Sequence, residues 1–198
     1  MQIQKNTLKA VSLLAAVRNA RFYLNGVCVE VMPDGIVNLV ATDGNALLAV
    51  AIPATMADAG GMLPGQYILP NDLVKAALKL KGQGGNEELT LSIDPNTKLA
   101  TFVGIGGQAA AVCIDGRFPD YRRVLPAAGQ ECKSAAQLDA KYAMAMQDAA
   151  KLLGIKNDFP HFAHVDGTTS VRVTFPSRNA LGVVMPVRIP DAYPAPTF

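Results

Sequence analysis

Three aspartates are the residues of this chain that come closest to a catalytic pattern. Asp43, Asp115 and Asp120 all lie in turn sequences. A pair of such carboxylates can act as general acid and base, or can hold a divalent metal. Nothing in their spacing fixes a shared site, so a metal-dependent enzyme that uses Asp43 or Asp115 stays open only as an alternative.

The other residues with chemical potential form no known catalytic motif. His161 and His164 are three positions apart in a predicted strand, where they face opposite ways. The run Gly104–Gly107 lies between two predicted strands and lacks the helix that a phosphate cradle needs, so it predicts a hairpin. The sequence has no Walker loop, no G-x-S-x-G elbow and no H-E-x-x-H helix. We therefore predict no catalytic residue, no metal site and no cofactor.

The composition predicts a folded chain with hidden surface. Of 198 residues, 50% are hydrophobic, which is enough to bury a sizeable core. Only 17% are charged, against about 25% in a typical domain, which favours an oligomer, with a compact monomer as the alternative. The net charge of +2 excludes a histone-like protein, so any contact with nucleic acid must come from local placement of charge.

Cysteine usage and hydropathy predict a cytoplasmic location. Cys28, Cys113 and Cys132 are an odd count without C-x-x-C spacing, which argues against a disulfide scaffold or a zinc ribbon. No apolar run approaches the roughly 18 residues of a membrane span. The run Ala10–Val17 is followed at once by Arg18 without a small-residue cleavage site, which favours a mature helix over a signal peptide.

A weak internal repeat organises the chain. Three segments each predict a short strand, then a helix, then several strands, and Ile3, Ile68 and Leu138 take equivalent places in the first strands. The apolar spacing of the first two helices is that of a helix with one buried face. The predicted strand and helix of each unit are Met1–Gln4 and Thr7–Val17, Gln66–Leu69 and Asn71–Lys81, and Ala135–Leu138 and Ala140–Leu153.

Hairpin signals follow each predicted helix. The turns Pro33–Gly35, Asp94–Thr97 and Asp166–Thr169 each separate two runs with strand character. Those runs are Val27–Met32 and Val37–Ala41, Leu89–Ile93 and Leu99–Val103, and His161–Val165 and Ser170–Phe175. We therefore predict an α+β fold of three βαβββ units, with the helices on one face of antiparallel sheets.

Loop composition predicts where the units separate. Ala54–Gly65 is rich in Ala, Gly and Pro and divides the first unit from the second, and Leu125–Lys133 divides the second from the third. The tail Pro190–Phe198 holds three prolines and predicts no regular structure.

Basic residues recur on the three predicted helices. Lys9 lies on the first, Lys75 and Lys79 lie one turn apart on the second, and Lys141 and Lys151 lie on the third. Such a surface suits non-specific contact with phosphates, although an ordinary solvated helix face explains any single lysine.

The loop after the first helix has a second nucleic-acid signal. Arg18, Arg21, Phe22 and Tyr23 can contact a nucleic-acid backbone and stack on bases. The alternative is a polar loop in which Phe22 or Tyr23 packs into the core.

Four motifs together resemble the bacterial DNA polymerase III beta subunit, the sliding clamp. They are the segments Arg21–Gly26, Val40–Gly44, Asp115–Pro126 and Val183–Ile189. Residues 1–126 resemble a complete clamp domain, the middle one, and residues 134–189 resemble the second half of the last domain. The βαβββ repeat is also the building block of this family.

The resemblance implies a non-catalytic ring around double-stranded DNA. Helices would line the bore, and the ring would tether a DNA polymerase or other partners that carry a clamp-binding motif. The DNA-binding residues implied by position are Lys9, Arg18, Arg21, Phe22, Tyr23, Lys75, Lys79 and Lys141.

The resemblance also implies an apolar pocket for partner peptides between the middle and last domains. The matching positions are Leu24, Thr42, Gly44, Leu47, Pro119, Arg123, Val124, Ser170, Val183 and Met185. Asn45 and Ala46 replace the family's usual His-Arg, which removes a charged rim, and the tail 190–198 extends past the family's usual end.

The prediction is a shortened, phage-like clamp homologue that forms a homo-oligomer. The unpaired third unit predicts a dimer at least, through residues 134–189. The family's ring contains twelve such units, so a tetramer would supply one ring. The alternative is a non-encircling adaptor, decoy or transcription coactivator that binds clamp-partner peptides.

Overall fold

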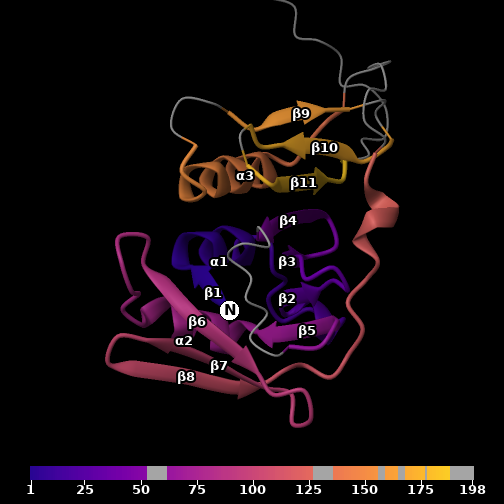
Figure 1. The fold of residues 1–198 in the computed structure, drawn as a ribbon. Coiled ribbons are helices and arrows are strands. Elements are labelled where there is room, and N and C mark those ends of the chain that lie inside the picture. The colour runs from indigo at the N-terminus through magenta and orange to yellow at the C-terminus, as the bar shows by residue number, and fades with distance from the viewer. Residues whose placement is uncertain (53–61, 127–135, 156–158, 165–167, 177, 188–198) are drawn as a thin grey trace, which may run out of the picture.

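The computed structural model of the chain describes residues 1–52, 62–126, 136–155, 159–164, 168–176 and 178–187 (Figure 1). The strands are β1 (Gln2–Gln4), β2 (Gly26–Val31), β3 (Val37–Thr42), β4 (Ala46–Ile52), β5 (Gly65–Pro70), β6 (Glu88–Ile93), β7 (Leu99–Gly104), β8 (Gly107–Val112), β9 (His161–Ala163), β10 (Val171–Thr174) and β11 (Ala180–Val184). The helices are α1 (Lys5–Ser12), α2 (Asn71–Lys79) and α3 (Ala140–Leu152), with short 3₁₀ helices at Phe22–Leu24 and Tyr121–Val124.

The predicted repeat is present in the order of the elements. The first unit is β1, α1 and β2–β4, and the second is β5, α2 and β6–β8. The third has α3 and β9–β11, but residues 136–138 of its predicted first strand form no strand, and Ala135 lies outside the described residues. The run Gly104–Gly107 joins β7 to β8 as the predicted hairpin.

The first two units exchange their first strands. β1 of the first unit pairs with β6 of the second, and β5 of the second unit pairs with β2 of the first. The result is a four-stranded sheet ordered β1-β6-β7-β8 and a seven-stranded sheet ordered β5-β2-β3-β4-β11-β10-β9. The third unit therefore continues the seven-stranded sheet through the antiparallel pairing of β11 with β4.

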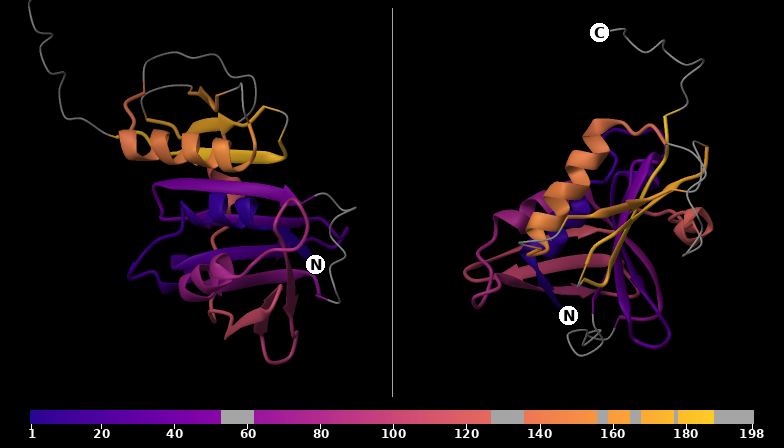
Figure 2. Two further views of the ribbon diagram at one scale, coloured as in Figure 1. Left: turned by 90° about the vertical axis from the view of Figure 1, so that its left-hand side faces the viewer. Right: turned by 90° about the horizontal axis from the view of Figure 1, so that it is seen from above.

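The three helices lie on one side of the seven-stranded sheet (Figure 2). α1 packs between α2 and α3. α1 ends at Ser12, earlier than predicted, because Leu14 and Ala16 turn back into the core and the Ala16 amide donates to the Leu24 carbonyl at 3.1 Å.

Alternating side chains of the seven-stranded sheet fill two cores. On the helix side, Val27 and Val29 join the large cluster beneath α1, α2 and α3. On the opposite face, Cys28 joins a smaller cluster that Phe118 and Tyr121 cover. The segment that holds these two aromatic residues therefore lies against the sheet face that the helices leave open, and Figure 1 shows it running along the side of the sheet.

The two described cysteines are buried core residues. Cys28 and Cys113 are free thiols, and burial raises the pKa of both, that of Cys113 to about 11. Neither thiol is therefore activated as a nucleophile. Several predicted features lie outside the described residues. They are Cys132, most of the two predicted boundary loops, residues 166–167 of the predicted third turn, and the tail.

Candidate functional site

The predicted peptide-pocket motifs converge on one cavity of about 200 Å³. It lies where the β3–β4 turn, the segment around residue 120 and the end of β11 meet. Its lining residues are Arg21, Leu24, Thr42, Gly44, Asn45, Ala46, Leu47, Pro119, Asp120, Tyr121, Val124, Val183 and Met185. We call this cavity the junction pocket, because its walls come from both the first two units and the third.

Two of the ten predicted residues do not line the junction pocket. Ser170 instead supports its wall, since its Oγ donates to the Val124 carbonyl at 2.7 Å. The Arg123 side chain is 83% exposed, with Nε at 3.9 Å from a carboxylate oxygen of Asp120. The other eight predicted residues all line the junction pocket. They are Leu24, Thr42, Gly44, Leu47, Pro119, Val124, Val183 and Met185.

The β3–β4 turn is shaped to form one wall of the junction pocket. The Thr42 hydroxyl donates to the Ala46 carbonyl at 2.7 Å and accepts from the Gly44 amide at 3.0 Å. Gly44 has a φ of +97°, and a Cβ there would collide with the guanidinium of Arg21. Glycine at this position therefore permits both the turn and the approach of Arg21 to the pocket rim.

Asp43 has a structural role in the same turn. One carboxylate oxygen accepts from the amides of Asn45 and Ala46 at 2.8 and 3.0 Å, and the other accepts from the Tyr142 hydroxyl at 2.6 Å. Burial and this hydrogen bond raise the pKa of Tyr142. Asp43 thus ties α3 to the pocket turn, which explains the residue without a metal.

Glu30 anchors the opposite wall and was missed by the sequence prediction. Its buried carboxylate accepts from Tyr121 Oη at 2.9 Å and from Arg122 Nη1 and Nη2 at 3.0 and 2.7 Å. Asn38 and Gln66 donate more weakly at 3.3 and 3.4 Å. Burial raises the pKa of Glu30, but the hydrogen bonds from Arg122, Tyr121 and Asn38 outweigh it and hold the pKa at about 2. The cluster fixes the segment around residue 120 on the sheet.

Replacing Glu30 by Gln is expected to lower the free energy of unfolding by about 2 kcal/mol at pH 7, since the buried carboxylate loses its charge-assisted hydrogen bonds while Arg122, 44% exposed, keeps contact with water. The folded pKa of about 2 lies below the ordinary 4.5, so the unfolded chain binds more protons between these values. Wild-type stability therefore falls as the pH drops through this window, and the difference from the variant shrinks. Urea unfolding at pH 7 and pH 3 measures both effects.

Glu87→Gln is the matched control for that experiment. Glu87 pairs with Lys5 at 2.7 Å, but its side chain is 57% exposed, so the loss is expected to be below about 1 kcal/mol. Equal losses in the two variants would show that the Glu30 cluster does not hold the pocket wall.

Three of the eight predicted DNA-binding residues lie together in a groove that is separate from the junction pocket. Arg18, Phe22 and Lys75 line one groove of about 600 Å³ between the loop after α1 and the start of α2. The loop is shaped by Asn25, whose side chain bonds the backbone of Asn19 at 2.8 and 2.9 Å. Phe22 is 55% exposed and thus available for stacking.

The other five predicted DNA-binding residues do not line this groove. Tyr23 is half-buried against the smaller core cluster, and Arg21 lies at the junction pocket. Lys9, Lys79 and Lys141 are exposed on their helices, and Lys141 pairs with Asp139 at 3.2 Å. Lys151 likewise pairs with Asp148 at 3.1 Å.

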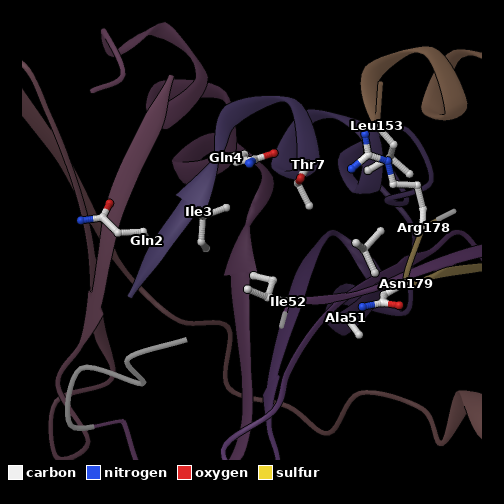
Figure 3. A pocket seen from close by; sticks show the side chains of 10 residues that line it. Gln2, Ile3, Gln4, Thr7, Ala51, Ile52, Leu153, Arg178 and Asn179 are labelled. Atoms are coloured by element: carbon white, nitrogen blue, oxygen red, sulfur yellow. The ribbon is translucent and has the colours of Figure 1, made fainter. Parts of the chain in front are cut away.

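A further cavity of about 290 Å³ lies at the other end of the β4–β11 pairing (Figure 3). Gln2, Gln4 and Thr7 line it from the first unit, and Arg178 and Asn179 line it from the third. No sequence signal pointed to it, since its residues come from two strands, α1, the C-terminal cap of α3 and a turn that only the fold brings together.

The histidines and carboxylates form no metal site in the part of the chain that the structure describes. No group of three or more His, Cys, Asp or Glu side chains is placed to hold an ion among those residues. His161 is on β9, and His164 follows its end. Among the described helices, none is both long and apolar enough to cross a membrane.

Comparison with known proteins places these observations in a family context. No family model matches the chain. Over 123 residues it is 36% identical to the beta sliding clamp of Proteus mirabilis, an alignment that covers 62% of the chain and 31% of that protein. The fold matches the DNA polymerase III subunit beta of Pseudomonas aeruginosa with a TM-score of 0.71 at 18% identity, over 96% of the chain and 66% of that structure. In sequence and in fold, the chain resembles the beta sliding clamp.

This resemblance confirms the prediction from the sequence motifs, and the fold is the α+β clamp fold. The beta sliding clamp of Caulobacter vibrioides is also 36% identical, over 109 residues that cover 54% of the chain and 28% of that clamp. The chain thus spans about a third of the curated clamps it matches. A Pseudomonas aeruginosa clamp solved bound to griselimycin matches with a TM-score of 0.68 and 19% identity, over 96% of the chain and 65% of that clamp.

Proposed function

We propose that the chain is a non-catalytic, sliding-clamp-like processivity factor for DNA replication in the bacterial cytoplasm. It surrounds duplex DNA as an oligomer and tethers a DNA polymerase, or another protein with a clamp-binding motif, through the junction pocket. The observation that carries this proposal is the convergence of all four clamp-like motifs, spread along the sequence from Arg21 to Met185, on the junction pocket. An apolar cavity with a few polar edges suits a short extended peptide.

The arrangement of the helices supports the DNA part of the proposal. α1, α2 and α3 lie on one side of the seven-stranded sheet (Figure 2). Lys9 is exposed on α1, and Lys75 and Lys79 are exposed on α2. Ring closure supplies the retention on DNA, so these lysines need only mobile contacts with phosphates.

The division of the chain supports the oligomer. We propose that residues 1–126 form one complete clamp domain, that residues 134–189 form half of another, and that 190–198 is a tail. Among the described strands, β8 pairs only with β7, and it takes the place that corresponds to β4 in the first unit, where β11 pairs. Four copies would supply the twelve units of a ring.

Val124→Asp is expected to weaken the binding of a clamp-binding polymerase peptide about 30-fold, because a carboxylate at the pocket rim loses water when the peptide docks. Val124 is 44% exposed, so the variant is expected to fold. Fluorescence anisotropy with the labelled peptide measures the dissociation constant.

Val103→Asp on β7 is the matched control, since Val103 is 37% exposed and does not line the junction pocket. If both variants bind the peptide as wild type does, the junction pocket is not the tethering site. The alternative function, a non-encircling adaptor or decoy, shares this pocket and differs in failing to remain on circular DNA.

A further inference from the structure

In residues 1–126, each unit receives the outer strand of its sheet from the other unit. β5 leaves the second unit and adds to the outer edge of β2 in the first, with Cys28 paired to Ile68. β1 makes the reciprocal addition to the edge of β6. In neither unit does the first strand pair with its own unit's sheet. Each of these units is therefore complete only when another unit supplies one strand and receives another.

The third unit has an open edge where such a strand belongs. Among the described strands, β9 pairs only with β10, whereas β2 and β6, which follow their helices in the same way, each have two neighbours. Since no described strand pairs with the outer edge of β9, that edge can accept one.

The third unit also has the strand-like segment that it would donate. The Gln137 carbonyl accepts from the Val187 amide at 2.8 Å, just as the Ile68 carbonyl of β5 accepts from the Ile114 amide at 2.8 Å. Gln137 and Ile68 each lie three residues before the first residue of their helix. Residues 136–138 are therefore held against their own unit as β5 is, but no described strand pairs with them.

Apolar side chains are exposed at the same place. Phe159, two residues before β9, is 70% exposed, whereas Leu24, two residues before β2, is 1% exposed in a cluster with Ile68 of β5. Val187, beside Gln137, is 44% exposed. In residues 1–126 the corresponding surface is covered by a strand of the neighbouring unit. The exposure of Phe159 and Val187 therefore indicates a surface of the third unit that a strand of another unit would cover.

We propose that two copies of the chain complete each other's third unit by strand exchange. Residues 136–138 of each copy add antiparallel to the outer edge of β9 in the other. The occupant is a second copy, because the same unit carries both the missing strand and the edge that needs it, so one two-fold operation satisfies both. The inference deepens the oligomer of the proposed function, but it requires neither DNA nor the junction pocket.

Sedimentation velocity of the full chain without DNA tests the exchange. The wild-type chain is expected to sediment at micromolar concentration with about twice its mass of 20.8 kDa. The double variant His161→Asp, Ala163→Asp places charge at two exposed positions of β9 and is expected to dimerise at least tenfold more weakly. The matched control is Ser92→Asp with Val103→Asp, exposed positions on β6 and β7, which is expected to leave the dimer intact.

Hydrogen exchange of the wild-type chain tests the location independently of any variant. The amides of residues 136–138 and 161–163 are expected to become protected as concentration rises through the dimerisation range. A wild-type monomer, unchanged dimerisation of the β9 variant, or a dimer without this protection would each overturn the exchange. Peptide binding by the same samples separates this failure from failure of the proposed function, since the junction pocket lies within one copy.

Discussion

Replacing Lys9, Lys75 and Lys79 together by alanine is expected to weaken binding to duplex DNA roughly 500-fold per site at 0.1 M salt. Each lysine that contacts a phosphate releases about 0.9 counterion, so three lost contacts reduce the slope of log affinity against log salt by about 2.7. The three side chains are exposed on α1 and α2 and form no ion pair in the described residues except that of Lys75 with Asp72 at 3.9 Å. Titrations of labelled DNA at several salt concentrations measure both quantities.

The matched control removes the same charge elsewhere. Lys98, Arg117 and Arg178 are exposed cations outside the three helices, and their alanine triple variant is expected to change DNA affinity only slightly. If the two triple variants bind DNA equally, the helices do not form the DNA-binding face.

The three helices do not carry lysines at the same positions, although the sequence pattern predicted basic residues on all three. The fifth residue of α1 is Lys9 and that of α2 is Lys75, but the fifth residue of α3 is Met144, which is 67% exposed. Asp148 takes the place that corresponds to Lys79. At these two corresponding positions α3 therefore has no lysine, and we expect the third unit to contribute least to DNA binding.

The sequence predicted the repeated units because apolar periodicity and turn residues are local signals. The second helix begins where predicted, at Asn71, and β3 begins at Val37. Strand exchange is not a local property, since β1 and β5 carry no mark of which sheet they join. The first strand of the third unit is absent from residues 136–138 for the same reason: a strand forms only beside an edge of another unit, and no described strand of another unit pairs with this segment.

The junction pocket could be predicted only through resemblance. Its residues are spread from Arg21 to Met185, and no spacing rule brings them together. Glu30 was missed because a single glutamate in an apolar strand gives no signal until Tyr121 and Arg122 are seen to bind it. Arg21 lies at the pocket because Gly44 has no side chain to block it, and its contact with DNA stays a prediction.

Retention on closed circular DNA tests the clamp function most directly. The chain is incubated with a closed plasmid at a concentration where it is oligomeric, and gel filtration in high salt then removes phosphate-bound protein. We predict that the chain co-elutes with the closed circle and is lost when one restriction cut opens it, and that blocking both ends of the linear DNA restores retention. Equal retention on open and closed forms, or loss from both, would contradict a ring that surrounds DNA.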